Sequence, residues 1–274
     1  MYHFFVDKQN IDTVNNRVII EGGDVNHIRN VLRMRPGEEI SVGTGEDDNE
    51  YRCEIESLEE DKVTCILRFI KSSDVESPAD IILFQGLPKA DKMEMIIQKC
   101  VELGVAEIVP ISCERCIVKL DDKKADAKVK RWQGIAEAAA KQSKRAVIPE
   151  ITLPLSMKEA LKKASGMDIK MIPYELARGM EKTSEIFGQI SKLRTENNTE
   201  NKAENKTENK TGDNAERRPQ IAVFIGPEGG FTEEEIKLAK ECGVEPISLG
   251  KRILRTETAG MTVLAWIDFC LEVR

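Results

Sequence analysis

Residues 220–273 read QIAVFIGPEGGFTEEEIKLAKECGVEPISLGKRILRTETAGMTVLAWIDFCLEV, and they alternate apolar strand patterns with helical patterns. Residues 220–226 and 246–250 are short apolar runs, which are typical of buried parallel strands. A helix is predicted after each of these strands, over 232–243 and over 258–273. Alternating strands and helices indicate an α/β domain with a mostly parallel sheet.

The same alternation extends back to residue 80. Earlier strands and long helices follow one another, with strands over 80–87, 106–112 and 168–175 and helices over 91–105 and 124–145. Residues 80–274 are therefore assigned to one α/β domain.

The N-terminal region, residues 1–72, has a different pattern of short β-branched and aromatic segments. Strands are predicted over 2–6, 17–20, 38–43, 51–58 and 62–70. Alternation within 51–58 places one set of side chains on a single face, namely Tyr51, Cys53, Ile55 and Ser57. Residues 24–34 have helical spacing, with Asp24 as the candidate N-cap. So many short strands predict a small β-barrel, which the polar linker 73–79 joins to the α/β domain.

Residues 195–216, TENNTENKAENKTENKTGDNAE, fit neither pattern. They contain no large apolar side chain, so burial cannot offset the entropy lost on ordering them. We therefore predict a disordered surface insertion, in preference to a functional acidic tail. Because loop-closure entropy rises slowly with length, the flanking strands are still expected to pair.

The charge balance is acidic. The 274 residues include 41 Lys plus Arg and 48 Asp plus Glu, for a formal net charge of −7. RNA binding would therefore depend on local patches. Residues 115–145 form such a patch, with ten cations and four anions by sequence. This excess predicts a phosphate-binding track, although a solvated helix face is an equal alternative.

The seven cysteines are odd in number and scattered, which favours free thiols in a reducing compartment. Cys113 and Cys116 have no second pair to match them, and the only histidines are His3 and His27, so no metal site is predicted. The N-terminus lacks the pattern of a signal peptide. The longest apolar stretch of the chain, near residue 268, is still too short and too polar to span a membrane. These features predict a cytoplasmic protein.

Two loops carry candidate chemistry, and the first is FIGPEGGFTEEE at 224–235. A glycine-rich turn after a parallel strand is where α/β sheets bind ligands, although an ordinary strand-to-helix turn is the alternative. Thr232 and Glu235 have the spacing of a capping box. The phosphate-binding fingerprints GxGxxG and the P-loop are absent, and Glu228 would repel a phosphate. A ligand with a nucleoside and a cationic centre suits this turn better.

The second loop is SLGKRILRTETAG at 248–260, which follows the next strand. It places cations beside the apolar pair Ile253 and Leu254, so we expect it to fold back and bury something rather than to be a solvated loop. It leads into a helix N-terminus, which favours anions such as RNA phosphates.

Several segments occur together and in one order: HIRNVLRMRPGEEI, QGLPKADKMEMIIQKCVELGV, CERC followed by VK, EAAAKQSKR, IGPEGGFTEEE and LGKRILRTETA. Together they resemble the RsmE family of small-subunit ribosomal RNA uridine-N3 methyltransferases, of the SPOUT class. The resemblance covers nearly the whole chain except the segment 195–216. It implies a PUA-like barrel that helps to bind RNA, an α/β domain with a deep trefoil knot, and a homodimer built through that domain.

The resemblance also implies that S-adenosylmethionine is held by the loops MIPYE, IGPEGG and LGKRILRTE. The cofactor-binding residues are then expected to be Ile172, Gly226, Glu228, Gly229, Leu249, Gly250, Ile253 and Leu254. The implied reaction is methylation of N3 of a specific uridine in 16S ribosomal RNA of the small subunit. Glu257 is the candidate proton acceptor and Arg255 the candidate stabiliser of the anionic base.

The candidate RNA-binding residues are Arg29, Arg33, Arg115, Lys119, Gln142, Arg145 and Arg252. The chain departs from the family pattern at His3, where a basic arginine is expected, and at Lys144, where a glycine is expected. Related enzymes that act on ribose or on transfer RNA, and a non-enzymatic RNA-binding assembly factor, stay open as alternatives. A nucleotide-dependent oxidoreductase or kinase is disfavoured because the phosphate motifs are absent.

Overall fold

The computed structural model describes residues 1–204 and 217–272, with the backbone alone for 194–204. The chain divides into two compact units. The first unit comprises Met1–Glu76 and Glu137–Ile148, and the second comprises Ser77–Ala136 and Pro149–Arg274. The sequence patterns placed residues 137–148 in the α/β domain, so their membership of the first unit was not predicted.

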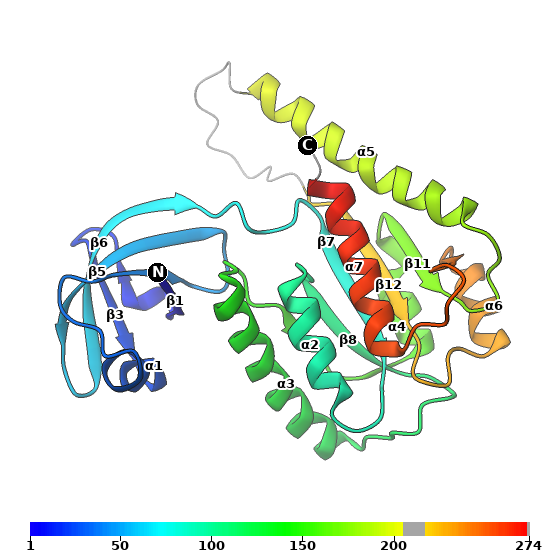
Figure 1. Cartoon of the computed structure of the whole chain (residues 1–274), viewed down its shortest axis with the longest axis horizontal. Helices are drawn as coiled ribbons and strands as arrows, with labels where there is room; N and C mark the ends of the chain where they lie inside the picture. Colours follow the sequence, from blue (N-terminus) through cyan, green and yellow to red (C-terminus); the bar gives the residue numbers. More distant parts are fainter. Residues whose placement is uncertain (205–216, 273–274) are drawn as a thin grey trace. The chain divides into compact units, whose positions relative to one another are not determined.

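Six strands form one sheet in the first unit, in the order β1-β4-β5-β6-β3-β2 (Figure 1). Their bounds are Tyr2–Phe5 (β1), Ile11–Asp12 (β2), Arg17–Glu21 (β3), Glu39–Gly43 (β4), Asn49–Leu58 (β5) and Lys62–Ser72 (β6). Strand β1 pairs in parallel with β4, and the other neighbours are antiparallel. The apolar face of the sheet forms the core of this unit, with Ile20, Ile40 and Ile55 almost completely buried.

A register shift in β5 changes one predicted detail. Tyr51, Cys53 and Ile55 are buried on one face as predicted, but the pairing with β6 shifts between Ile55 and Ser57. Because a bulge interrupts the alternation of side chains, Ser57 is only half-buried and does not continue that face.

The predicted helix over 24–34 is shorter and irregular. Helix α1 covers Gly23–Asn26, and a π-helical turn over His27–Val31 follows it. The N-cap is Gly22, which has φ +74°, so the prediction of Asp24 as the cap is wrong. Asp24 lies inside the first turn, and its carboxylate pairs with Lys141 Nζ at 3.0 Å.

A buried ion pair joins residues 137–148 to the rest of the first unit. Arg145 Nη2 lies 2.5 Å from Glu76 Oε2, and the two side chains are 5% and 4% exposed. The backbone N–H of Ala146 also donates to Glu76, at 2.9 Å. The prediction that Arg145 binds RNA is therefore wrong, because its guanidinium is buried against a carboxylate.

The second unit is built on a parallel sheet, as predicted, in the order β10-β8-β7-β12-β11-β13 with β9 paired to β8. The strands are Asp80–Gly86 (β7), Glu107–Ser112 (β8), Glu150–Ile151 (β9), Leu155–Ser156 (β10), Ile169–Pro173 (β11), Gln220–Ile225 (β12) and Glu245–Ile247 (β13). The central strands β7 and β12 are apolar on both faces, and Phe84 stacks on Phe224 with ring centroids 4.4 Å apart.

The helices of the chain after α1 are Lys92–Glu102 (α2), Asp122–Ser143 (α3), Met157–Lys163 (α4), Glu181–Glu204 (α5), Glu233–Glu241 (α6) and Thr256–Glu272 (α7). Helix α7 packs between α2 and α5 and lies against β12, where it buries Val263, Leu264 and Ile267 (Figure 1). In the described parts of the chain, no helix combines the length and apolarity needed to cross a bilayer.

Helix α5 differs from the prediction for residues 195–216. It continues through Glu204, so the first part of the predicted disordered insertion is helical. Glycine and proline are absent from 189–204, and a helix propagates readily once it has nucleated. The rest of the predicted insertion, 205–216, lies outside the described residues.

The strand order determines which loops can meet. Strands β12, β11 and β13 are consecutive in the sheet and parallel, so their carboxyl ends lie at one edge. Strand β7 is the other neighbour of β12, which brings the residues after β7 to the same edge. A site at this edge can therefore draw on several distant parts of the sequence.

Candidate functional site

A cavity of about 480 Å³ lies at the carboxyl ends of β11, β12 and β13. Its walls come mainly from the loops that follow these strands, together with Lys92 of α2. The lining residues are Lys92, Pro173, Tyr174, Glu175, Ile225, Gly226, Pro227, Glu228, Gly230, Phe231, Ser248, Leu249, Gly250, Lys251, Arg252, Ile253, Leu254, Arg255, Thr256 and Ala259. The predicted meeting of these loops in one pocket is confirmed.

The turn after β12 packs closely on the end of β7. A Cβ atom at Gly86 would lie 2.7 Å from the backbone nitrogen of Pro227, so only glycine permits this approach. The turn ends in the predicted capping box of α6. Thr232 Oγ1 accepts from the N–H of Glu235 at 3.2 Å, and Glu235 Oε2 accepts from the N–H of Thr232 at 2.9 Å.

Residues after β8 hold this turn from outside. Arg115 Nη1 donates to the carbonyl of Gly229 at 2.9 Å, and the N–H of Glu114 donates to Glu235 Oε1 at 2.8 Å. Arg115 was predicted to contact RNA. Its side chain is exposed, but one of its donors is used to fix the turn.

Two consecutive buried hydrogen bonds lie next to the cavity. Gln85, at the end of β7, is completely buried, and its Nε2 donates to Thr256 Oγ1 at 2.9 Å. Thr256 Oγ1 in turn donates to the carbonyl of Gly226 at 2.7 Å. Two hydrogen bonds therefore connect the ends of β7 and β12 to the start of α7.

The loop after β13 is shaped by Gly250, whose φ of +98° favours glycine. The N–H of Gly250 donates to Ser248 Oγ at 3.2 Å, and Thr183 Oγ1 of α5 donates to the carbonyl of Ser248 at 2.9 Å. Beyond this anchored turn, Leu254 is half-buried in the cavity wall, whereas Ile253 is 84% exposed. Of the two apolar residues on which the prediction of a folded-back loop was based, Leu254 therefore contributes to the cavity wall and Ile253 is largely exposed.

Charged groups gather at one end of the cavity. Lys92 Nζ lies 3.0 Å from Glu228 Oε1 and 3.4 Å from Glu257 Oε2. The hydrogen bond to Glu228 raises the pKa of Lys92 above its usual value, so Lys92 is a cation at neutral pH. Burial opposes the ionisation of Glu228, but hydrogen bonds from its own backbone N–H, from Lys92 and from the backbone of Lys89 lower its pKa below the usual value.

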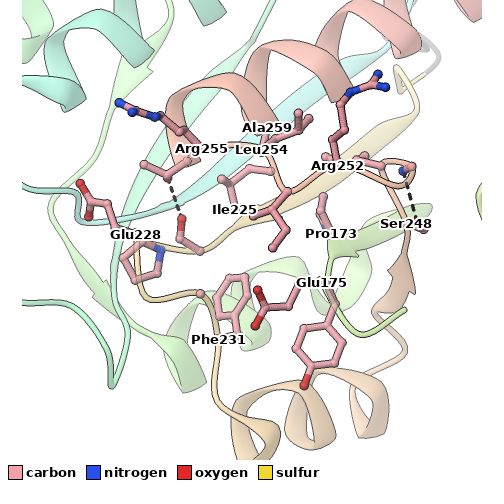
Figure 2. Close-up of a pocket in the computed structure, with 18 of the residues that line it drawn as sticks. Pro173, Glu175, Ile225, Glu228, Phe231, Ser248, Arg252, Leu254, Arg255 and Ala259 are labelled. Carbon is pink, nitrogen blue, oxygen red and sulfur yellow. Dashed lines mark hydrogen bonds between the residues drawn. The ribbon is translucent and has the colours of Figure 1, made fainter. Parts of the chain in front are cut away.

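The two loop arginines that line the cavity extend outward from it. Figure 2 shows the guanidinium groups of Arg252 and Arg255 directed away from the cavity. The side chain of Arg255 is 81% exposed, and its Nη1 lies 4.0 Å from Glu257 Oε1. Glu257 itself does not line the cavity, but its side chain is only 13% exposed.

Most of the predicted cofactor-binding residues are brought together. Those that line the cavity are Gly226, Glu228, Leu249, Gly250, Ile253 and Leu254. Gly229 lies in the same turn, outside the lining. Ile172 is completely buried within β11, and the next residue, Pro173, reaches the cavity in its place.

The remaining predicted RNA-binding residues are spread more widely. Arg252 lines the cavity, and Lys119 lies exposed in the loop after β8. The others belong to the first unit, where Arg33 and Gln142 are exposed and Arg29 is half-buried. These residues keep the accessibility that binding to RNA requires.

Several residues of the site were missed, above all Lys92, Gln85 and Glu175. Lys92 and Gln85 could have been found from sheet order, since β7 is a neighbour of β12. Glu175 belongs to the predicted MIPYE loop, but only Ile172 was named there. Figure 2 shows the Glu175 carboxylate projecting toward Phe231.

The lining has the chemistry of a nucleoside site. Ile225, Phe231 and Leu254 offer apolar surface, and the carboxylates of Glu175 and Glu228 favour a ligand with hydroxyl groups or positive charge. Within the described residues, no group of three or more His, Cys, Asp or Glu side chains could hold a metal ion. The cysteines of the site region, Cys113 and Cys116, are buried free thiols.

Comparison with known proteins gives a consistent result. A family model described as an RNA methyltransferase domain matches residues 75–268, and one described as an RNA methyltransferase PUA domain matches residues 20–68. A crystal structure of a ribosomal RNA small subunit methyltransferase E from Neisseria gonorrhoeae, bound to S-adenosyl methionine, has a TM-score of 0.74 with 31% identity. That match covers 97% of this chain and 95% of the other.

Curated relatives match along the whole chain. Ribosomal RNA small subunit methyltransferase E of Bacillus subtilis is 34% identical over 275 aligned residues, covering 100% of this chain and 98% of the relative. The protein of the same name from Mesomycoplasma hyopneumoniae is 32% identical and covers 96% of this chain and 97% of its own. The chain therefore belongs to the ribosomal RNA small subunit methyltransferase E family, RsmE, with a PUA domain followed by an α/β methyltransferase domain.

Proposed function

We propose that this chain methylates N3 of a specific uridine in 16S ribosomal RNA, with S-adenosylmethionine as methyl donor. The observation that carries the proposal is the convergence of the loops after β11, β12 and β13 on one cavity in a member of this family. When bound, S-adenosylmethionine supplies a methyl group activated by a positively charged sulfur.

The cavity fits this cofactor. Its volume of about 480 Å³ is within the range of pockets for small molecules. Pro173, Ile225 and Leu254 provide apolar walls for the adenine ring, and the carboxylates Glu175 and Glu228 suit the hydroxyl and cationic groups. Ile253 is 84% exposed in the cavity rim, where a ligand would cover it.

Glu257 is the proposed proton acceptor. Its Oε2 is buried and has the ammonium of Lys92 as its ion-pair partner, at 3.4 Å, so lone pairs remain on the carboxylate to take a proton. Uridine N3 must lose its proton as it gains the methyl group. The N3–H bond is replaced by an N3–CH₃ bond, the bond from the methyl carbon to the donor sulfur breaks with its electron pair left on sulfur, and the proton passes to the Glu257 carboxylate.

RNA is proposed to contact accessible basic and polar side chains of both units. Arg29, Arg33 and Gln142 of the first unit, and Arg252 and Lys119 of the second, stay candidates, whereas Arg145 does not. These groups suit phosphate contacts, which position RNA without reading its sequence. Because the proposed substrate belongs to the small ribosomal subunit, we propose that the enzyme acts in the cytoplasm, in ribosome biogenesis.

We also propose that the α/β domain contains the trefoil knot of its class and forms a homodimer. Apolar side chains are exposed on both of the adjacent helices, Met95 near the start of α2 and Phe269 near the end of α7, and they support a protein interface on these helices. Sedimentation of the purified protein tests the dimer. A monomer at micromolar concentration would remove this part of the proposal.

The test of the proposed function is mass spectrometry of 16S ribosomal RNA from cells that lack the protein. We expect one N3-methyluridine to be lost, to return with the wild-type chain, and not to return with Glu257→Gln. Unchanged modification in the deleted cells would contradict the function. Restoration by Glu257→Gln would contradict only the role of Glu257.

A further inference from the structure

Lys92 is the cation that the structure places at the charged end of the cavity. Its ammonium carries three N–H donors, and two carboxylates lie within ion-pair distance, Glu228 at 3.0 Å and Glu257 at 3.4 Å. These partners come from the loop after β12 and from helix α7, so they hold the ammonium from two elements. A third donor is left over, on a side chain that lines the cavity and is 30% exposed.

The arginine expected to stabilise the anionic base is placed less well. Arg255 is 81% exposed, and Figure 2 shows its guanidinium directed away from the cavity. Arg252 is oriented in the same way. In this structure Lys92 is also the cation nearer to the proposed proton acceptor, with its Nζ 3.4 Å from Glu257, whereas Arg255 Nη1 lies 4.0 Å from it.

We propose that Lys92 is a catalytic residue, whose remaining N–H binds a carbonyl oxygen of the target uracil and stabilises the charge that forms there as N3 loses its proton. The inference rests on the proposed function, and it assigns a catalytic role to a residue that the sequence patterns did not indicate. Removing a proton from N3 places negative charge on the neighbouring carbonyl oxygens. A fixed cation beside that charge lowers the barrier, because it needs no reorganisation during the reaction.

The two carboxylates give this cation a second property. When Glu257 takes the N3 proton, its negative charge disappears, and Lys92 loses one of its two partners. The positive charge of the ammonium is then balanced by one carboxylate fewer, so its attraction for the uracil oxygen increases, without movement, as that oxygen gains charge. The arrangement therefore couples the proton transfer to the electrostatic stabilisation.

The experiment compares single-turnover methylation of 16S ribosomal RNA, in small subunits, by Lys92→Met, Lys92→Arg, Arg255→Met and the control Lys99→Met. Lys99 lies on the same helix and pairs with Glu102 outside the cavity. We expect Lys92→Met to slow methylation by about 100-fold, the typical loss for one stabilising donor. Lys92→Arg should restore part of the rate, Arg255→Met should lose less than Lys92→Met, and Lys99→Met should match the wild type.

Two further measurements separate catalysis from structure. The charged groups that face Lys92 are Glu228 in the loop after β12 and Glu257 on α7, with Arg255 beside Glu257. Without the ammonium, N3 is harder to deprotonate, so the rising limb of the pH–rate profile should move to higher pH in Lys92→Met. Calorimetry with S-adenosylmethionine should show binding similar to that of the wild type, and circular dichroism an unchanged fold.

Wild-type rates in Lys92→Met, or an unshifted pH profile, would overturn the inference and leave the proposed function standing. A slow variant that has also lost its affinity for the cofactor would overturn it too, since the effect would then be on binding. If the wild type itself does not methylate the RNA, the proposed function fails first, and the role of Lys92 fails with it.

Discussion

The buried side chain of Thr256 connects two parts of the second unit through its hydrogen bonds. Its hydroxyl accepts from Gln85 and donates to the carbonyl of Gly226, so it uses both of its hydrogen-bonding functions. These partners are 171 and 30 residues away in the sequence. The hydroxyl therefore connects the first glycine of the cavity turn to a strand at the centre of the sheet.

Replacing Thr256 by Val keeps the shape but removes both hydrogen bonds. We expect the free energy of unfolding to fall by about 1–3 kcal/mol, because Gly226 and Gln85 lose a buried partner. Affinity for S-adenosylmethionine, measured by calorimetry, should also fall as the turn loosens. Thr262→Val is the matched control on the same helix, where the hydroxyl donates only to the carbonyl of Thr258 at the surface. An equal loss of affinity in the control would contradict the role of Thr256.

His3 makes the stability of the first unit sensitive to acid. Burial, helped by Lys141, Arg52 and Lys144 and opposed by Glu50, lowers the pKa of His3 to about 4 from 6.5. Its Nδ1 bonds to Ser41 Oγ at 2.9 Å, and its Nε2 is buried without a hydrogen-bond partner in the described residues. The folded state therefore holds His3 neutral, whereas the unfolded chain takes up a proton below its own pKa.

Because the folded pKa is depressed, the contribution of His3 is complete above pH 6.5 and is lost as the pH falls toward 4. We expect a loss of about 2 kcal/mol between pH 7 and pH 5 from this group alone. Urea unfolding of wild type and His3→Gln at both pH values measures it. The glutamine variant should lose less stability on acidification, and equal losses in the two proteins would show that other groups dominate.

At the scale of helices and strands, two capping boxes allow a controlled comparison. Thr232 caps α6 at the edge of the cavity, and Ser156 caps α4 in the same way, through Glu159. Each cap satisfies backbone N–H groups that a helix leaves free at its N-terminus. The two capping boxes have the same hydrogen-bonding pattern, but only the box of Thr232 lies at the edge of the cavity.

We expect Thr232→Ala and Ser156→Ala each to lower the free energy of unfolding by about 1 kcal/mol. Only Thr232→Ala should weaken binding of S-adenosylmethionine, since Phe231 and the glycine turn precede that cap directly. Thermal unfolding and calorimetry provide the two readouts. If Ser156→Ala weakens binding equally, the effect is one of general stability.

The long periodic elements were predictable from sequence because their patterns repeat. Helices α2, α6 and α7 and the central strands β7 and β12 appear where periodicity placed them. Helix α4 and the short strands β9 and β10 were missed, since two to seven residues give too little pattern.

The walls of the cavity were predictable in part. The glycine turn after β12 and the loop after β13 carry local signals, namely strand ends, glycines and clustered charges. Lys92 and Gln85 carry none, because their roles depend on partners more than 130 residues away, as the pairing of Lys92 with Glu228 illustrates. The burial of Arg145 against Glu76 also depends on a partner that is distant in the sequence, so no local pattern indicated it.

At the scale of the whole molecule, the chain has two cores that the sequence order does not separate cleanly. The first unit buries residues such as Ile20 and Ile55 on its sheet, and the second buries Phe84 and Phe224 on the paired strands β7 and β12. Helix α3 contributes residues to both units. Whether the units unfold together is therefore a question of how strongly their cores are coupled.

The two tryptophans of the chain, Trp132 and Trp266, both belong to the second unit, so tryptophan fluorescence follows that unit alone. The cavity also lies in the second unit. A cofactor that binds only the folded state should add about 2.7 kcal/mol to the unfolding free energy of this unit at a hundred times the dissociation constant. Urea unfolding followed by fluorescence, with and without S-adenosylmethionine, measures this gain. Hydrogen exchange in β5, Asn49–Leu58, reports on the first unit and should stay unchanged; an equal gain in β5 would mean that the two cores unfold as one.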